Sequence, residues 1–247
     1  MRGKTNLITG ASDGLGRGVA GVLDTTVRTY QADPPSLKEV RSLAEEPLGA
    51  EDRIDVLIAN AGIGGGPRRE SADGHELHFA VNSLSQFLLI TRLLGRLRAS
   101  APARIVLVSS LAQTPIDFND VKLERSCEGL RAYGQSKVQV AFGFRLARRL
   151  DPSEVTATSL HPTSGMPTKI VYTAGRPLVD SLERGVAATT RLAVDPELEG
   201  VTGAFCDRER QASPNPWATD SEAQERLWQL SEQLSDATEV STREAAS

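Results

Sequence analysis

Apolar runs of strand length alternate along this chain with longer segments of helical periodicity. We predict strands at 4–9, 26–32, 54–59, 103–109, 154–160 and 202–206, and helices at 15–23, 35–46, 75–98, 132–150, 180–193 and 220–234. Such alternation is typical of βαβ units, which build a parallel sheet with helices on its faces. We therefore predict an α/β fold with a doubly wound parallel sheet, in a single domain and with six strands.

Length, charge and cysteine content indicate the number of domains, the kinds of binding partner and the cellular location to expect. The 247 residues favour one domain over residues 1–235, followed by a flexible polar tail over 236–247. A net charge of -4 argues against binding nucleic acid or an anionic membrane. Cys127 and Cys206 lie far apart, outside any CxxC or Cys/His cluster, which favours a reducing, cytoplasmic location.

A glycine-rich turn follows the first predicted strand and opens the first predicted helix. It reads TGASDGLG from Thr9 to Gly16. Glycines let the backbone approach a pyrophosphate closely, and the N–H groups at the start of the helix then meet its charge. On its own the turn is a weak signal, because a plain strand-to-helix turn could read the same way.

Two further places carry groups suited to acid–base chemistry. Tyr133 and Lys137 stand at i and i+4 of a predicted helix, so we expect them on one face, where an ammonium favours the phenolate. Such a tyrosine can act as a general acid or base. Ser109 and Ser110 end a predicted strand, where either hydroxyl could hold a substrate oxygen or cap the local backbone.

Taken together, the motifs resemble those of the short-chain dehydrogenase/reductase family over about residues 4–210. They are TGASDGLG at the first turn, NAG at 60–62, Asn82, Ser110, YGQSK at 133–137 and HPT at 161–163. The insertion between Ser110 and Tyr133 and the first turn with Arg17 resemble the retinol-dehydrogenase-like branch. This resemblance implies a Rossmann-like sheet and an NAD(P)-dependent oxidoreductase.

The resemblance also assigns roles to residues of this chain. The matching catalytic tetrad is Asn82, Ser110, Tyr133 and Lys137. The expected cofactor-binding residues are Gly10, Ser12, Asp13, Gly14, Leu15, Gly16, Asp33, Asn60, Ala61, Gly62, Tyr133, Lys137, Pro162 and Thr163. Tyr133 would donate a proton to a carbonyl oxygen as hydride arrives from the nicotinamide, and Ser110 would hydrogen-bond the same oxygen.

One βα unit of the family pattern is missing after the first turn. Only 17 residues separate Gly16 from Asp33, where the pattern has a further strand and helix. That unit normally chooses between NAD and NADP. If 26–32 closes against the first strand, Asp33 would meet the adenosine ribose and favour NAD; if it does not, the family resemblance favours NADP. Asp33 could equally cap the helix that begins near Pro34.

The sequence gives little reason to expect a catalytic or metal-binding histidine. His161 precedes Pro162 and Thr163 and is interpreted as a loop anchor, while Thr163 stands where the family more often has the glycine of a Pro-Gly pair. His75 and His78 have no acidic cluster at metal-ligand spacing, so no metal site is expected.

We therefore predict an oxidoreductase that interconverts a carbonyl and a secondary alcohol on a small hydrophobic molecule, using NADP or NAD. The alternative is a redox-inactive member of the same fold that uses its crevice for ligand binding or cofactor-free acid–base chemistry, such as cyclisation or dehydration. The missing unit motivates that alternative. The expected partner is a small-molecule substrate, with a homodimer or homotetramer possible through the helices at 75–98 and 132–150.

Overall fold

The computed structural model describes residues 3–23, 28–125 and 129–237 and contains a six-stranded sheet. The strands are β1 (Asn6–Ile8), β2 (Val56–Ala59), β3 (Ala103–Val108), β4 (Val155–His161), β5 (Ala204–Asp207) and β6 (Arg210–Gln211). They lie in the order β1-β2-β3-β4-β5-β6. The first five are parallel, and β6 pairs antiparallel with β5.

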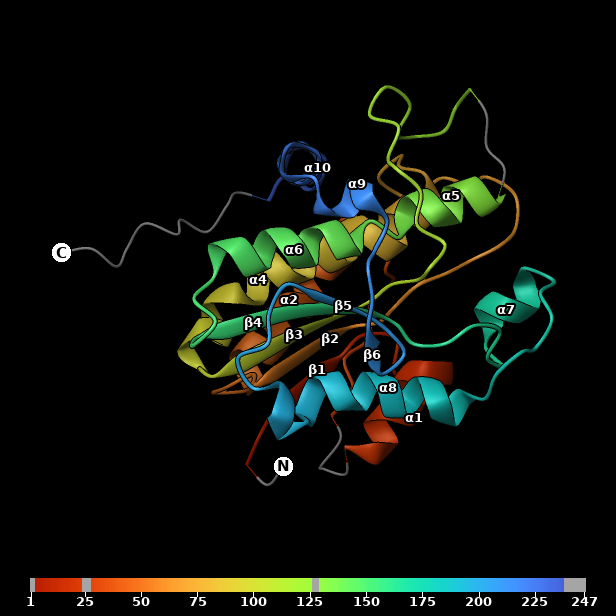
Figure 1. Cartoon of the computed structure of the whole chain (residues 1–247). Helices are drawn as coiled ribbons and strands as arrows, with labels where there is room; N and C mark the ends of the chain where they lie inside the picture. Colours follow the sequence, from red (N-terminus) through yellow and green to blue (C-terminus); the bar gives the residue numbers. More distant parts are fainter. Residues whose placement is uncertain (1–2, 24–27, 126–128, 238–247) are drawn as a thin grey trace.

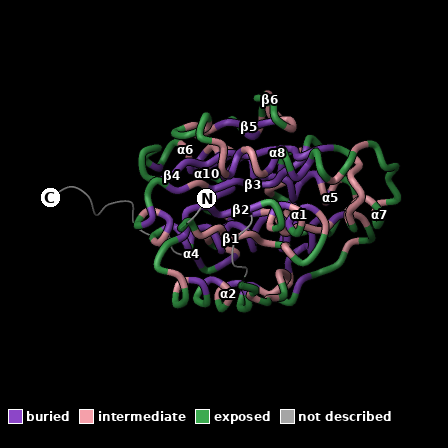
Figure 2. The backbone as a smooth tube through the Cα atoms, turned by 90° about the horizontal axis from the view of Figure 1, so that it is seen from below, coloured by how far each residue is buried: buried purple, intermediate pink, exposed green. Residues whose placement is uncertain are grey.

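Helices cover both faces of the sheet, as the apolar strands require (Figure 1). On one face lie α2 (Leu37–Ala50), α4 (Ser85–Ala99), α6 (Gln139–Arg149) and α10 (Ser221–Ser235), and on the other α1 (Gly14–Val22) and α8 (Leu182–Val194). Alternate strand residues enter the two cores: Leu57 packs with the first group of helices and Ile58 with the second. Figure 2 shows the strands buried between these layers. The sequence-based helices at 15–23, 180–193 and 220–234 match α1, α8 and α10.

Shorter helices connect these layers. They are α3 (Leu77–Phe79), the π-helical η1 (Ala80–Leu84), α5 (Gly129–Ser136), α7 (Lys169–Thr173), the 3₁₀ turn η2 (Pro196–Leu198) and α9 (Pro216–Thr219). The domain ends with α10 at Ser235, and most of the predicted tail, from 238, lies outside the described residues.

The predicted helix at 75–98 forms as a continuous run of α3, η1 and α4. The segment Leu77–Ala99 is long and apolar enough to span a membrane by composition, but 89% of its most apolar window is buried inside the protein. Phe87 of this run stacks edge-on against Trp228 of α10, with ring centroids 4.7 Å apart, and contacts Phe142 of α6. The helix is therefore central to the larger core.

The predicted helix at 132–150 divides into two. Lys137 and Val138 form a turn between α5 and α6, in which the Lys137 N–H donates to the Gly134 carbonyl at 3.1 Å. Helical periodicity continues through the turn, which is why sequence alone predicted one helix. The division matters for the site, because Tyr133 lies before it and Lys137 within it.

The predicted strand at 26–32 is wrong for the part that the structure describes. Residues 28–32 form no strand, and 26–27 lie outside the described residues. Among the described strands, β1 pairs only with β2. Instead, the Arg28 guanidinium binds the Glu51 carboxylate at 3.0 Å and the Tyr30 hydroxyl donates to it at 3.4 Å, which ties this segment to the end of α2. The expected number of six strands is reached through the antiparallel β6.

Ser36, and not Asp33, caps the helix that was expected to begin near Pro34. Helix α2 begins at Leu37, and the Ser36 hydroxyl accepts from the Glu39 N–H at 3.4 Å. Asp33 is exposed, and its N–H donates to the Glu39 carboxylate at 2.7 Å. The side chain of Asp33 therefore has no capping role.

We expect Ser36→Ala to lower the free energy of unfolding by about 1 kcal/mol, because an N-cap oxygen is lost. Asp33→Ala should change it by no more than about 0.5 kcal/mol, since only an exposed side chain is removed. Urea unfolding of the two variants measures the difference. An equal loss in both would contradict the assignment of Ser36 as the cap.

Candidate active site

The glycine-rich turn between β1 and α1 adopts a conformation that only glycine accommodates readily. Gly10 and Gly14 have φ values of +68° and +51°. A Cβ at Gly16 would lie 2.4 Å from the Gly10 carbonyl oxygen, so a side chain there has no room. The Asp13 carboxylate caps α1 by accepting from the Gly14 N–H at 2.8 Å. Ser12 and Asp13 are exposed, and Leu15 is buried beneath them.

Hydrogen bonds join this turn to the NAG motif that follows β2. The Thr9 hydroxyl accepts from the backbone N–H groups of Asn60 and Ala61, each at 2.9 Å, and the Asn60 amide donates to the Thr9 carbonyl at 2.8 Å. The Gln86 amide donates to the Ala61 carbonyl at 3.0 Å. The first two predicted cofactor segments are thus held together at the carboxyl ends of β1 and β2. Gln86 was not singled out from sequence, since a glutamine within a helix gives no signal of this contact.

Asn82 connects the loop after β2 to α5. It lies buried in η1, where its amide nitrogen donates to the Ile63 carbonyl at 2.9 Å and to the Ser136 hydroxyl at 2.7 Å, while its oxygen accepts from the Ile63 N–H at 2.7 Å. All these contacts hold backbone and side-chain positions around the site. The local π-helical turn is of a kind often found at functional sites.

Tyr133 and Lys137 lie close together despite the turn between α5 and α6. The Lys137 ammonium is 5.2 Å from the centroid of the Tyr133 ring. A Cβ placed on Gly62 would be 3.4 Å from that ammonium, and one on Gly64 would be 3.2 Å from the Tyr133 ring. Lys137 is buried, and Tyr133 is partly exposed. The predicted pair therefore faces the loop that follows β2.

The two serines after β3 have different contacts. Ser109 donates its hydroxyl to the Lys137 carbonyl at 3.1 Å, so it positions the turn that carries the lysine. Ser110 accepts from the Ala112 N–H at 3.1 Å, and within the described part of the chain its hydroxyl hydrogen has no acceptor. Of the two serines, Ser110 is thus the one whose hydroxyl hydrogen is left for a further partner. Both side chains are buried at the carboxyl end of the strand.

The loop that follows β4 packs over the first turn. His161 contacts the Ser164 hydroxyl at 3.0 Å, and burial lowers the pKa of its imidazole, as expected for a loop anchor. Pro162 and Thr163 are buried, and the Thr163 hydroxyl donates to the Asp180 carboxylate at 2.7 Å. A Cβ placed on Gly185 would lie 2.9 Å from Met166, 3.4 Å from Leu15 and 3.5 Å from Thr163. Thr163 thus lies beside the first turn.

Asp33 is the predicted cofactor residue that the structure does not bring to the glycine turn. It precedes α2, whereas its predicted contact with the ribose depended on a strand beside β1 that residues 28–32 do not form. Of the two arginines that could clamp a 2′-phosphate, Arg28 pairs with Glu51, and Arg17 is exposed on α1.

His78 forms a buried pair near the site. Its Nδ1 lies 2.8 Å from the Glu76 carboxylate, and its Nε2 lies 3.2 Å from the Gly65 carbonyl. Burial would raise the pKa of Glu76, but the bonds from His78 and the Phe79 N–H outweigh it and hold that pKa below its usual value. In the described ranges, no three His, Cys, Asp or Glu side chains gather as they would around a metal.

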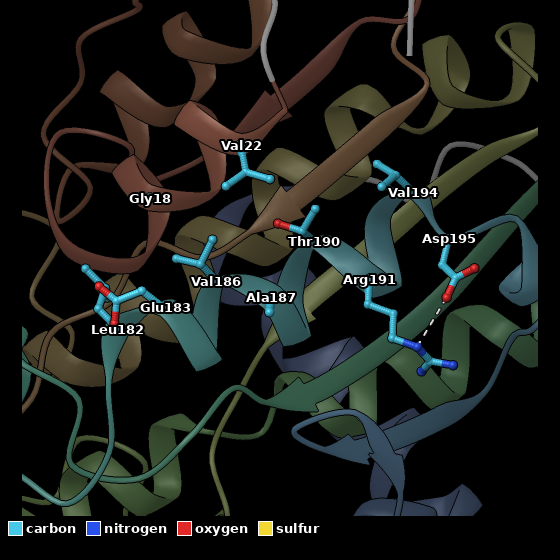
Figure 3. A pocket seen from close by; sticks show the side chains of 10 residues that line it. All are labelled: Gly18, Val22, Leu182, Glu183, Val186, Ala187, Thr190, Arg191, Val194 and Asp195. Atoms are coloured by element: carbon cyan, nitrogen blue, oxygen red, sulfur yellow. Dashed lines mark ion pairs between the residues drawn. The ribbon is translucent and has the colours of Figure 1, made fainter.

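A separate groove of about 530 Å³ runs along the outside of α1 and α8 (Figure 3). Its lining is mainly apolar and includes Val22, Val186, Ala187 and Val194, with an ion pair between Arg191 and Asp195 at its rim. None of its residues belongs to the loops that follow β1 to β4. We therefore place the candidate site at those loops and not in this groove.

The residues at the carboxyl ends of the strands fit part of a dinucleotide. The glycine turn, in which Gly16 packs directly against the Gly10 carbonyl, opens the nine-residue helix α1, whose N-terminus suits a pyrophosphate. Lys137 lies beside Gly62 in the loop after β2, and the family resemblance gives this lysine a contact with a ribose of the cofactor. On the far side of β1, the described residues provide no strand to support the adenosine end.

Comparison with known proteins decides the family. The family described as short chain dehydrogenase matches residues 22–176. The chain is 35% identical to human retinol dehydrogenase 13, covering 98% of this chain and 87% of that protein, and 33% identical to mouse retinol dehydrogenase 14, covering 94% and 86%. This chain belongs to the short-chain dehydrogenase/reductase family. Within it, the chain falls in the retinol-dehydrogenase-like branch.

Solved structures show the same fold. An uncharacterised protein from Mycobacterium paratuberculosis has a TM-score of 0.75 at 26% identity, covering 96% of this chain and 95% of that one. The NADH complex of 3-ketoacyl-(acyl-carrier-protein) reductase from Brucella melitensis has a TM-score of 0.64 at 22% identity, covering 84% and 99%. The solved structures thus confirm the Rossmann-like fold, and the family together with its retinol dehydrogenase relatives makes this chain an NAD(P)-dependent oxidoreductase.

The alignment with the human relative also bears on the shortened first part of the chain. It extends over 289 positions, more than the 247 residues of this short-chain dehydrogenase/reductase. The chain therefore has gaps relative to that protein. Gaps of this kind are compatible with the missing βα unit that the motif spacing predicts.

Proposed function

We propose that this enzyme interconverts a carbonyl and a secondary alcohol on a small hydrophobic substrate. The observation that carries the proposal is the Lys137 ammonium, 5.2 Å from the Tyr133 ring centroid, in a site that Asn82 connects to the loop after β2. Proton transfer to a carbonyl oxygen needs a positioned donor, and the Tyr133 phenol beside the buried Lys137 ammonium provides one.

Each polar group of the site has a distinct part in the proposed reaction. The nicotinamide cofactor supplies the hydride when bound. Tyr133 donates its phenol proton to the substrate oxygen, and Lys137 stabilises the negative charge that develops on the phenol. Ser110 directs its free hydroxyl hydrogen to the same substrate oxygen. Asn82 holds the Ile63 backbone and Ser136, so that the surrounding loops keep their positions.

Apolar side chains around the strand ends support a hydrophobic substrate. Leu111 follows β3, Leu130 lies on α5, Tyr172 lies on α7, and Leu178 and Val179 follow it. All five are more than half exposed. They belong to the long connections around the site, and α5 and α7 lie toward the same end of the molecule (Figure 1). The relatives named for retinol, an apolar alcohol, agree with this class.

The experiment that tests the proposal is a titration with NADH and NADPH, followed by a panel of carbonyl compounds. The panel contains medium-chain and aromatic ketones, retinal as an apolar aldehyde that would give a primary alcohol, and a hydroxylated ketone as the polar control. We expect binding of at least one dinucleotide and reduction of the apolar carbonyls in preference to the polar one. Binding without reduction of any panel member, or a preference for the polar ketone, would count against the proposed substrate class.

A second candidate function is a redox-inactive protein of the same fold that binds ligands or performs cofactor-free acid–base chemistry. The specific observation in its favour is that β1 has no described strand on its far side to support an adenosine. The same titration separates the two candidates. Absence of binding to both dinucleotides at millimolar concentration would favour the second.

For the choice of cofactor we propose NADP. A strand at 26–32 paired with β1 would favour NAD, but residues 28–32 form no strand. The choice between NAD and NADP is therefore based on the family resemblance, which favours NADP. We expect Asp33→Ala to leave the ratio of the NADH and NADPH dissociation constants unchanged within about twofold, since Asp33 is exposed and makes no described contact with the glycine turn. Titration of both cofactors checks this, and a large shift toward NADPH in the variant would restore Asp33 as the ribose-reading acid.

Location and assembly are further proposals. We propose a cytoplasmic protein that acts on a small molecule and requires neither nucleic acid nor a membrane. A homodimer or homotetramer through α4 and the α5–α6 region is the proposed assembly, and light scattering of the purified protein measures it.

A further inference from the structure

Lys169 lies over the glycine turn although it is distant from it in sequence. It begins α7 in the loop that follows β4, and its ammonium is 3.0 Å from the Asp13 carboxylate. The neighbouring Thr168 packs on the same turn, because a Cβ at Gly14 would lie 3.3 Å from its methyl group. The loop after β4 therefore places a positive charge at the start of α1.

Asp13 uses its two oxygens for different partners. One accepts from the Gly14 N–H and caps α1, and the other binds Lys169. The bond from Lys169 comes first among the causes that hold the pKa of Asp13 below its usual value, followed by the Gly14 N–H. Asp13 is thus an anion at the helix N-terminus where this family binds a pyrophosphate, and Lys169 neutralises it.

The ion pair between Lys169 and Asp13 contributes little to the stability of the fold. The side chains of Lys169 and Asp13 are 83% and 50% exposed, and ion pairs at such sites contribute little to stability. An exposed lysine with four flexible carbons can exchange one anionic partner for another at low cost. A dinucleotide at the turn would present a more highly charged partner than Asp13 within the reach of this side chain.

We propose that Lys169 is a cofactor-binding residue that exchanges the Asp13 carboxylate for the pyrophosphate of the dinucleotide. The inference rests on the proposed function, in that a dinucleotide occupies the glycine turn. Binding of the cofactor then holds the loop after β4 over the turn through Lys169, in addition to the Thr163–Asp180 bond at the base of that loop. Asp13 competes with the cofactor for Lys169 and adds a negative charge beside it.

The test is a set of dissociation constants for NADH and NADPH, measured by nicotinamide fluorescence on the full chain without turnover. We expect Lys169→Ala to raise both dissociation constants by about two- to fivefold, as loss of an exposed ion pair does. Asp13→Asn should tighten both by about two- to fivefold, because asparagine still caps the helix and the competing charge is gone. Arg92→Ala is the charge control, since Arg92 is exposed on α4, on the opposite face from α1.

A double variant distinguishes a direct contact between Lys169 and the cofactor from a role in which Lys169 only holds the loop after β4 through Asp13. If Lys169 acts on the cofactor, Lys169→Ala should cost at least as much in the Asp13→Asn background as in the wild type. If Lys169 only tethers the loop through Asp13, both single variants would weaken binding and the effect of Lys169→Ala would vanish in that background, which would overturn the inference.

The remaining outcomes identify which proposal fails. An effect of Lys169→Ala confined to NADPH would assign the lysine to a 2′-phosphate and refute the pyrophosphate contact. Unchanged affinities in Lys169→Ala, with normal binding by the wild type, would refute this inference alone. Absence of binding by the wild-type protein would overturn the proposed function as well.

Discussion

Tyr133→Phe is expected to lower kcat by about 10²- to 10⁴-fold, the range that a positioned general acid contributes. The dissociation constant of the cofactor should stay within a few-fold, because the variant removes one oxygen and keeps the ring that packs beside Gly64. The Lys137 ammonium, 5.2 Å from the ring centroid, would remain without the phenol whose charge it stabilises. Steady-state kinetics on the preferred carbonyl, with a fluorescence titration of the cofactor, measure both quantities.

Tyr30→Phe is the matched control, because Tyr30 binds Glu51 at the end of α2 and belongs to no loop of the site. It should keep kcat within about twofold. Turnover by Tyr133→Phe at a rate comparable with the wild type would remove Tyr133 from the role of general acid, whatever the control shows.

Lys137→Ala is expected to impair both catalysis and cofactor binding. The ammonium lies beside the Tyr133 ring and also beside Gly62 in the loop after β2. The family resemblance gives Lys137 a contact with a ribose of the cofactor. We expect a loss of about 10²-fold in kcat, within the range for acid–base assistance. We also expect about tenfold weaker cofactor binding, as loss of a hydrogen bond to a charged group produces.

The backbone contacts of Lys137 do not involve its side chain, so Lys137→Ala tests the side chain alone. The residue lies in the turn between α5 and α6, and the Ser109 hydroxyl holds its carbonyl and not its side chain. Alanine therefore leaves the backbone contacts in place, and circular dichroism of the variant should match the wild type. A loss confined to kcat would remove the ribose contact from the scheme, and a loss confined to the dissociation constant would remove the assistance to Tyr133.

Much of the site could be predicted because its residues follow strands with strong local signals. Thr9, Asn60 and Ser110 each come after an apolar run, and parallel strands bring their carboxyl ends to one edge. The structure joins the first two by hydrogen bonds. The contacts of Ser109 and Gln86 could not be predicted, because each reaches a backbone carbonyl whose position depends on how distant elements pack.

The failures have a common physical origin. Residues 26–32 have the composition of a strand, but a strand forms only when a neighbour accepts its hydrogen bonds, and the Glu51 carboxylate holds Arg28 and Tyr30 elsewhere. The helical periodicity of the sequence likewise continues through Lys137, although the backbone forms a turn there. In both cases the pattern is local, whereas the outcome depends on partners that are distant in sequence.

The sequence by itself determined most of the alternation of strands and helices and the glycine turn, and it predicted the family and the acid–base residues. These depend on periodicity, on conformations that only glycine accommodates and on motif order, all of which are properties of neighbouring residues. Only the tertiary structure decided that β1 has no described partner beyond β2, that Ser36 and not Asp33 caps α2, and that Lys169 lies against Asp13. Those outcomes depend on which distant groups compete for the same hydrogen bond or charge, and that competition is settled only when the chain is packed.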